Sequence, residues 1–306
     1  MKILVTGGAG FIGSHVVNGL LEARHEVVVV DNLTTGHPHN LHPDAAFYEM
    51  NILDSQLADV FDQEKPDIVN HHAAQIDVRK AVADPLFDAQ QNIIGSIHLI
   101  EHCREHGVQK IVYASTGGAI YGEQVYLPAD EEHPIRPLSP YGISKHTVEH
   151  YLDLASLNFG LNYTVLRYAN VYGPRQDPHG EAGVVAIFSE SLFRGDQPTI
   201  FGDGSSTRDY VFVEDVVEAN LLAMEGGTGQ IYNVGTGSET DLNELVIKLK
   251  TAIGAEIDTI YAPPRLGEVD KIALANDKIK RDLGWAPAHS LEEGFVKTAQ
   301  YYRSLK

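Results

Sequence analysis

Two spacings of apolar residues alternate along the first half of the chain. Short apolar runs, typical of buried parallel strands, are separated by stretches in which apolar residues recur with helical spacing. The apolar runs cover residues 2–6, 25–30, 46–50, 67–70, 110–114 and 163–167. The main helical stretches cover residues 14–23, 92–105 and 141–159. This alternation predicts an α/β fold, a Rossmann-like doubly wound parallel sheet with helices on its faces.

The second half of the chain is less regular. Turn-rich segments at 172–180 and 201–206 are followed by a strand and helix at 211–224 and a strand at 231–234. Helices are expected at 242–253 and 291–302. The pattern predicts one unit over residues 1–170, with a return segment near 210–235. A smaller, interleaved C-terminal lobe is expected over residues 171–306.

A glycine-rich turn follows the first strand. Gly7, Gly10 and Gly13 stand at the spacing Gly-x-x-Gly-x-x-Gly, and Asp31 ends the second strand. This order of strand, glycine turn, helix, strand and acid is the context of a dinucleotide fingerprint. Gly7 permits the tight turn, Gly10 lets the backbone approach a pyrophosphate, and Gly13 lets the helix pack closely. Asp31 suits the adenosine ribose diol and would repel a 2′-phosphate, so NAD is favoured over NADP.

Later strand ends extend this predicted cofactor site. Asp54 follows the third strand and could reach an adenine amine. The small Ala73 and Ala74 follow the fourth strand, where a cofactor approaches a doubly wound sheet closely. The adjacent His71 and His72 should point to opposite sides of an extended chain, which favours roles in the core over metal binding. No metal site is expected.

Tyr141 and Lys145 are four residues apart on a predicted helix and so share one face. A lysine held close to a tyrosine favours the phenolate, which would let Tyr141 exchange a proton with a sugar or alcohol hydroxyl. Ser115 and Thr116 follow the strand at 110–114, where a hydroxyl could bond the reacting group. By themselves these two residues are more typical of a turn or helix cap.

Charge and cysteine content limit the partners and the compartment. The formal net charge of −19 argues against nucleic acid or an anionic membrane as partner, and an anionic ligand must find local Arg residues. The single cysteine, Cys103, excludes an intramolecular disulfide and fits a reducing compartment. The first strand begins at residue 2, which leaves no room for a signal peptide, and no apolar run is long enough to span a bilayer. A cytoplasmic protein is expected.

Taken together, the motifs resemble those of extended short-chain dehydrogenases/reductases, specifically nucleotide-sugar epimerases of the UDP-glucose 4-epimerase type. The resemblance covers almost the whole chain. It is carried by the segments 6–13, 31–33, 72–74, 141–145, 167–174 and 208–215. These motifs are highly specific for the superfamily and less specific for the sugar.

The resemblance implies a reversible oxidation at sugar C4. Tyr141 would remove the 4-hydroxyl proton while C4 gives hydride to tightly held NAD, and the 4-keto sugar would turn and take hydride back on its other face. Lys145 would bind the nicotinamide ribose, Tyr168 would lie near the nicotinamide, and Asn92 would lie beside the cofactor. The predicted cofactor contacts are Gly7, Gly10, Phe11, Ile12, Gly13, Asp31, Asn32, Ile52, Asp54, Ala73, Ala74, Asn92, Tyr141, Lys145 and Tyr168.

The resemblance also implies a site for a UDP-sugar. Asn170 is assigned to the diphosphate, Arg208 and Arg265 to phosphate or ribose, and Glu268 to a ribose hydroxyl. Bidentate pairing of Arg with phosphate would offset the net negative charge of the chain.

The chain departs from the family pattern at the catalytic hydroxyl. Counting back from Tyr121 places the usual Ser or Thr on Gly117, whereas counting back from Tyr141 places it on Thr116. Thr116 is therefore the expected catalytic hydroxyl, with Ser115 as substitute.

Two other activities fit the same scaffold less well. A nucleotide-sugar 4,6-dehydratase needs an acid and a base after the Thr, but Gly117, Gly118 and Ala119 follow here and the next carboxylate is Glu123. The alternatives kept are another nucleotide-sugar enzyme of this superfamily, a dehydratase or 4-ketoreductase, and a non-catalytic NAD-binding regulator. The regulator would be expected to lack Tyr141 or Lys145.

Substrate range and assembly follow from family analogy alone. In the family, a bulky aromatic residue near the position of Ile272 is associated with exclusion of N-acetylated sugars, so N-acetylhexosamines are expected to be admitted with UDP-glucose and UDP-galactose. Family members commonly dimerise through two helices, which here correspond to 92–105 and 141–159. A homodimer is therefore expected.

Overall fold

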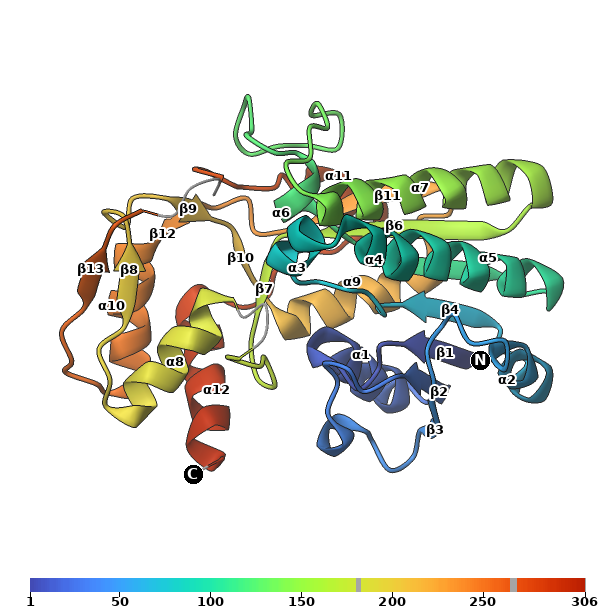
Figure 1. Ribbon diagram of the computed structural model, residues 1–306, viewed down its shortest axis with the longest axis horizontal. Coiled ribbons are helices and arrows are strands. Elements are labelled where there is room, and N and C mark those ends of the chain that lie inside the picture. The colour runs from blue at the N-terminus through green and yellow to red at the C-terminus, as the bar shows by residue number, and fades with distance from the viewer. Residues whose placement is uncertain (180–182, 265–268, 306) are drawn as a thin grey trace.

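The computed structural model describes residues 1–179, 183–264 and 269–305, and its larger part is built on one parallel sheet (Figure 1). The strand order is β11-β6-β5-β4-β1-β2-β3, and every neighbouring pair is parallel. The strands are β1 (Lys2–Thr6), β2 (Glu26–Asp31), β3 (Ala46–Glu49), β4 (Ile68–His71), β5 (Lys110–Thr116), β6 (Asn162–Tyr168) and β11 (Gln230–Val234). The predicted doubly wound fold is confirmed, because the strand order runs outward in opposite directions from the neighbouring strands β1 and β4.

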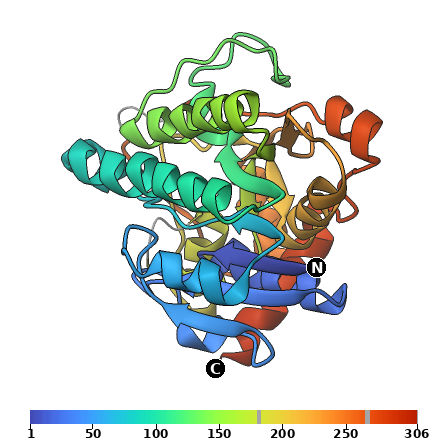
Figure 2. The same cartoon turned by 90° about the vertical axis from the view of Figure 1, so that its right-hand side faces the viewer.

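Helices cover both faces of this sheet (Figure 2). One face is covered by α1 (Phe11–Glu22), α9 (Val213–Glu225) and α11 (Asp277–Leu283), whose apolar residues share a core cluster with β1 and β6. The other face is covered by α2 (Leu57–Glu64), α5 (Gly95–Glu105) and α7 (Pro140–Phe159), which share a second cluster. Strands buried on both faces read as continuous apolar runs, which is why the sequence revealed them.

The short helices of this unit lie near the carboxyl ends of its strands. They were not predicted, since each is too short to show a periodic apolar pattern. They are η1 (Pro38–Asn40), α3 (Val78–Ala83), α4 (Pro85–Ala89), the π-helical turn η2 (Gln90–Ile94) and α6 (Gly117–Ile120). The helix expected over 92–105 thus begins within the π-helical turn and continues as α5.

The C-terminal lobe lies beside the sheet unit and has a core of its own (Figure 1). Its helices are α8 (Val184–Arg194), α10 (Leu242–Ile253) and α12 (Leu291–Ser304). Its parallel strand pairs are β7 (Asn170–Tyr172) with β10 (Tyr210–Phe212), and β8 (Thr199–Phe201) with β13 (Ile260–Ala262); β9 (Thr207–Arg208) and β12 (Thr240–Asp241) pair antiparallel.

The chain passes between the two parts more than once. After β6 it enters the lobe, returns through α9 and β11 to the sheet, and later returns again as α11, whose Ile279 lies in the core beside the sheet. None of the helices in the described ranges combines the length and apolar character required to cross a bilayer.

Candidate active site

The glycine turn after β1 leaves no space for side chains. Gly7 has a φ of +72°, and a Cβ on it would lie 2.7 Å from the amide nitrogen of Ala73. A Cβ on Gly13 would lie 2.2 Å from the carbonyl oxygen of Gly7. The Gly10 N–H donates to that same carbonyl over 3.1 Å. Strand β1, helix α1 and the end of β4 therefore meet with bare backbone, as dinucleotide binding requires.

Asp31 is held against this turn at the end of β2. Its Oδ2 accepts the N–H of Ala9 over 2.9 Å, and its Oδ1 accepts the N–H of Leu33 over 2.8 Å. The residue is 8% exposed. Each carboxylate oxygen retains a lone pair for a further donor, such as a ribose hydroxyl. The neighbouring Asn32 is exposed, and its side chain accepts the N–H of Thr34.

Asn92 lies in the π-helical turn, and both N–H groups of its side-chain amide donate within the protein. Its Oδ1 accepts the Gln75 N–H over 2.8 Å, while Nδ2 donates to the Gln75 carbonyl and to Asp88 over 2.9 and 3.0 Å. The buried Asp88 also accepts the Ser144 hydroxyl over 2.6 Å. Asn92 thus holds the loop that begins with Ala73, and Ala73 packs against Gly7 of the glycine turn. π-Helical turns are often found at functional sites.

Ile52 and Asp54 follow β3 at the same edge of the sheet. Ile52 is buried in the core, and its carbonyl accepts the ring N–H of His98. The Asp54 carboxylate accepts the Asn51 N–H over 2.8 Å and closes a turn. Ile52 and Asp54 therefore each make a structural contact at the edge of the sheet where the adenine of the cofactor is expected.

Helix α7 begins at the predicted catalytic pair. The Ser139 hydroxyl caps the helix by accepting the Gly142 N–H over 3.2 Å, and Pro140 occupies the first turn. A Cβ on Gly142 would lie 2.5 Å from the carbonyl oxygen of Ala119, so α7 packs tightly on α6 there. Tyr141, one turn before Lys145, is half-buried.

Lys145 is buried at the carboxyl end of β5. Its Nζ donates to the Ala114 carbonyl over 2.8 Å and lies 4.8 Å from the centre of the Tyr113 ring. Burial lowers the pKa of Lys145 to about 8, although the nearby carboxylates of Asp88 and Glu149 act in the opposite direction. The lysine is therefore a cation near neutral pH that can readily lose its charge.

The structure separates the two candidate hydroxyls. Both Ser115 and Thr116 belong to β5, which runs two residues further than expected, and successive side chains of a strand point to opposite faces. The Ser115 hydroxyl is buried and donates to Glu149 over 2.6 Å. A Cβ on Gly118 would lie 3.8 Å from Thr116 Oγ1 and 3.6 Å from Asn170 Oδ1. Thr116 and Asn170 thus border the same space, and Ser115 does not.

The missing hydroxyl at Gly117 has a steric reason. A Cβ there would lie 2.4 Å from Cδ1 of Leu274, which is completely buried. Leu274 comes from the segment between β13 and α11, so the sequence near Gly117 gave no sign of this contact.

A buried ion pair supports β5 and α7, and the sequence patterns did not reveal it. Arg167 donates to Glu149 through Nε over 3.1 Å and through Nη2 over 2.6 Å, and to the Tyr121 hydroxyl over 2.9 Å. Burial would raise the pKa of Glu149, but hydrogen bonds from His146, Arg167 and Ser115 together with the Arg167 charge lower it to about 2. In the sequence, only the position of Glu149, one helical turn after Lys145, indicated that this carboxylate lies near the catalytic pair.

His71 and His72 point to opposite sides of the chain, as predicted. His71 lies between the hydroxyls of Thr6 and Ser96, at 2.7 and 2.9 Å. The His72 ring is stacked on Tyr168 with 6.3 Å between ring centres. Burial lowers the pKa of both histidines, that of His72 to about 3. In the described ranges, no group of three or more His, Cys, Asp or Glu side chains could hold a metal ion.

On the lobe side, Asn170 and Arg208 lie on short strands. The Asn170 N–H donates to the Asp209 carbonyl in the β7–β10 pair. Arg208 donates to the carbonyls of Thr207 and Asp270 over 2.8 and 3.2 Å. The N–H of the buried Ile272 also bonds the Thr207 carbonyl, so Ile272 lies next to Arg208. Arg265 and Glu268 lie outside the described residues.

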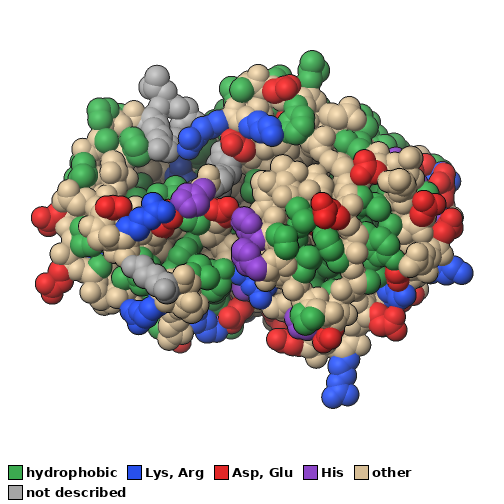
Figure 3. Space-filling view, turned by 60° about the horizontal axis from the view of Figure 1, so that its bottom comes forward, with side chains coloured by type: hydrophobic (Ala, Val, Ile, Leu, Met, Phe, Trp, Pro, Cys, Tyr) green, Lys and Arg blue, Asp and Glu red, His purple; other side chains and the backbone are tan. Residues whose placement is uncertain are grey.

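A cavity of about 970 Å³ opens in the lobe. Phe201 and Tyr261, which are 38% and 56% exposed, contribute aromatic rings to it. The rest of the lining is Gly202, Asp203, Ser205, Ser206, Asn243, Ala262, Pro264 and Asp270. Figure 3 shows the surface hollowed between the lobe and the sheet unit, with His, Lys and Arg side chains along the hollow. The sequence reading treated residues 201–206 as a loop only and so missed this cavity.

Comparison with known proteins agrees with this geometry. The sequence model of the NAD dependent epimerase/dehydratase family matches residues 3–235. A putative UDP-glucose 4-epimerase of Methanocaldococcus jannaschii is 47% identical over 302 residues, which are 99% of this chain and 98% of that protein.

Two solved structures are similar over their full lengths. The UDP-glucose 4-epimerase of Thermotoga maritima, crystallised with UDP-glucose, is 52% identical with a TM-score of 0.98, covering 100% of this chain and 99% of that one. The UDP-glucose 4-epimerase of Thermus thermophilus, in complex with NAD, is 44% identical with a TM-score of 0.95 over 100% of both chains. The chain therefore belongs to the NAD-dependent epimerase/dehydratase family.

Proposed function

We propose that this enzyme inverts C4 of a UDP-hexose, interconverting UDP-glucose and UDP-galactose through a 4-keto sugar. The observation that carries the proposal is the position of Lys145, one turn after Tyr141 on α7: its Nζ bonds the Ala114 carbonyl near the carboxyl end of β5, the strand that ends at Thr116. Strand ends of this kind carry the site in doubly wound sheets. The Gly7 turn lies at the same edge of the sheet.

The residues of the chain would transfer one proton, that of the sugar 4-hydroxyl. Tyr141 would take the proton of the sugar 4-hydroxyl and later return it, and a cation at Lys145 favours the phenolate form that this needs. Thr116 would hold the same hydroxyl by a hydrogen bond. NAD held beside the sugar would supply the reversible hydride acceptor for C4. The glycine turn and Asp31 would hold the cofactor through bare backbone and a carboxylate.

The nucleotide would lie between the lobe and the sheet unit. Asn170 and Arg208 border this region, and we assign them to the diphosphate and ribose, together with Arg265 and Glu268. A guanidinium is needed here because the net charge of −19 would otherwise repel a diphosphate. The exposed rings of Phe201 and Tyr261 offer platforms on which a base can stack.

A dehydratase activity is disfavoured by the residues after Thr116. Elimination of water needs an acid and a base beside the sugar, whereas α6 begins with glycines at 117 and 118. The first acid, Glu123, is exposed and accepts the N–H of Asp270. Simple C4 redox chemistry is what the described side chains can support.

We propose that N-acetylated hexosamines are also accepted. Ile272, a buried aliphatic residue, stands near the position of the family's bulky aromatic residue, and its N–H bonds the Thr207 carbonyl beside Arg208. Purified enzyme incubated with UDP-GlcNAc should form UDP-GalNAc, detected by chromatography; absence of this product under conditions that turn over UDP-galactose would restrict the enzyme to non-acetylated sugars.

We also propose a homodimer, acting in the cytoplasm. The outer face of α7 leaves Ile143, Tyr151, Leu154 and Leu157 between 39% and 76% exposed, which is more apolar surface than a solvated helix normally carries. Light scattering should give twice the chain mass of 33.5 kDa. A monomer at micromolar concentration would contradict this assembly. The single thiol, Cys103, is buried and free, in keeping with a reducing compartment.

The decisive variant is Tyr141→Phe. It should lower the rate of UDP-galactose conversion by at least about 100-fold, because the proton acceptor is lost, while bound NAD stays. NAD content is measured after denaturing the purified protein. Thr116→Val should cost more activity than Ser115→Ala. Undiminished turnover in the Tyr141 variant would disprove the mechanism.

A further inference from the structure

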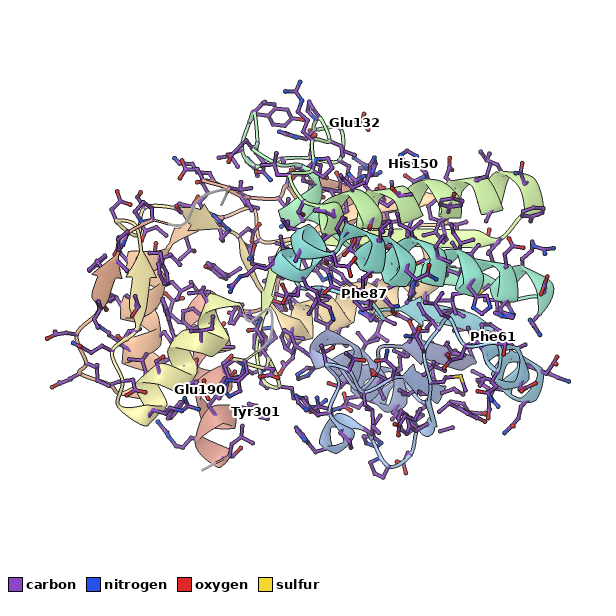
Figure 4. The ribbon with its side chains drawn as sticks, in the orientation of Figure 1. Phe61, Phe87, Glu132, His150, Glu190 and Tyr301 are labelled. Atoms are coloured by element: carbon purple, nitrogen blue, oxygen red, sulfur yellow. The ribbon has the colours of Figure 1, made fainter. Side chains whose placement is uncertain are left out.

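Helix α7 carries two histidines on a side that the proposed reaction does not use. The Nε2 atoms of His146 and His150 are 3.1 Å apart, and the rings meet edge to face with 4.6 Å between centres. Two side chains four residues apart on a helix can bring their ends to one point. Figure 4 shows His150 at the edge of α7 that faces away from α5.

A buried carboxylate fixes the His146 ring. His146 Nδ1 lies 3.1 Å from Glu149 Oε2. An ionised carboxylate only accepts hydrogen bonds, so Nδ1 carries the proton and Nε2 carries a lone pair. Arg167 holds the same carboxylate in place. An imidazole that donates one N–H to a carboxylate and aims its other nitrogen outward is the arrangement of histidines that bind metals.

Open space lies in front of this pair. A cavity of about 250 Å³ is lined by His146, His150, Glu149, Asp153 and Arg167, together with Tyr163 and Ile231. The His146 side chain is 24% exposed, and His150 is exposed. Asp153 accepts the Tyr163 hydroxyl over 3.1 Å and has lone pairs left for a water molecule. The cavity therefore has room for an ion with its waters.

We propose that His146 and His150 bind a divalent transition metal of the Zn²⁺, Ni²⁺ or Cu²⁺ class, with water filling the remaining positions. If the metal lies about 2.0–2.1 Å from each Nε2 atom, their 3.1 Å separation gives an N–metal–N angle of about 95–102°, between octahedral and tetrahedral values. Without a metal, the Nε2–H of His150 donates to Nε2 of His146. When the metal binds, the neutral His150 carries its proton on Nδ1 instead, so metal binding releases no net proton. Imidazole ligands disfavour Mg²⁺ and Ca²⁺, which prefer oxygen.

A similar pair on α5 provides an internal comparison. The Nε2 atoms of His98 and His102 are 3.2 Å apart, but the outer partner of His98 is the Ile52 carbonyl and the His102 ring is stacked on Phe61. A carbonyl supports a metal-bound imidazole less strongly than an ionised carboxylate, and the stack limits movement of His102. We therefore expect the α7 pair to bind more tightly.

The test uses the full-length enzyme, purified without a polyhistidine tag and stripped with a chelator. Ni²⁺ is titrated by calorimetry into the wild type, His150→Gln, His146→Ala and the matched control His98→Ala. His150 is exposed in the single chain, so its replacement should not disturb folding; because it lies on the α7 face assigned to the dimer, light scattering must show that His150→Gln assembles as the wild type does. Binding should persist in His98→Ala and weaken by about tenfold or more in His150→Gln and His146→Ala.

Two further readouts separate the outcomes. Ni²⁺ should raise the melting temperature of the wild type and of His98→Ala but not of His150→Gln, because a ligand that binds only the folded state stabilises it. The Cu²⁺ form should show coordination by two nitrogens in its electron paramagnetic resonance spectrum. Ni²⁺ binding that is unchanged in His150→Gln, or that is lost only in His98→Ala, would overturn the proposal.

Discussion

Glu149→Gln tests the buried ion pair that supports the catalytic helix. The substitution keeps the shape of the side chain but removes the charge that faces Arg167. The side chains of Glu149 and Arg167 are each at most 3% exposed. The guanidinium would then be buried without a counter-charge. Breaking a buried pair in this way typically costs about 3–5 kcal/mol.

The lowered pKa of Glu149 gives a second magnitude for the same contacts. It is lowered from 4.5 to about 2 because the hydrogen bonds and the Arg167 charge overcome the effect of burial. At 1.36 kcal/mol per pH unit, the ionised form is stabilised by about 3 kcal/mol. A carboxylate whose folded pKa is lowered contributes this stability above its unfolded pKa. The contribution disappears as pH falls from about 4.5 towards 2.

Urea unfolding, followed by the fluorescence of the buried Trp285, measures the effect. At pH 7 the variant should be less stable than the wild type by about 3 kcal/mol, and the difference should shrink as pH falls below 4.5. Exposed Glu132→Gln is the control and should change little. Replacing both partners, by Glu149→Gln with Arg167→Met, should recover part of the loss.

Two results would refute this reasoning. One is a destabilisation at pH 7 below about 1 kcal/mol, which would mean that the pair is solvated. The other is a difference between wild type and variant that stays constant down to pH 3, because the Glu149 charge would then not be its source.

Three other predictions concern the site itself. Burial lowers the pKa of Lys145 to about 8, so its cation is lost as pH rises through that value and kcat/KM should fall above about pH 8; a profile flat to pH 10 would contradict this role. Gly13→Ala places a methyl group 2.2 Å from a backbone carbonyl oxygen of the glycine turn, so the purified protein should contain little NAD, whereas Gly118→Ala, with no atom nearer than 3.6 Å, should retain it. Gly117→Ser should lose about 1–3 kcal/mol in urea unfolding, because its Cβ would lie 2.4 Å from Leu274; a stable variant with raised activity would show that the site has room for a hydroxyl there.

The sequence predicted the sheet unit well because the features that identify its elements involve residues close together in the chain. Parallel strands buried on both faces are apolar throughout, and a glycine turn must follow the first of them directly. The helix at 242–253 has the predicted bounds, since Asp241 caps its start and Gly254 ends it with a φ of +78°. The lobe was less predictable, because its strands have only two or three residues and show no periodicity.

What the sequence determined by itself was the order of the elements, the glycine turn and the spacing of Tyr141 and Lys145, all of which depend on near neighbours in the chain. The tertiary structure alone decided that Ser115 faces Glu149 while Thr116 borders the space beside Asn170. It also decided that Leu274 excludes a side chain at Gly117. These outcomes depend on contacts between segments far apart in sequence, whose packing no local pattern of residues records.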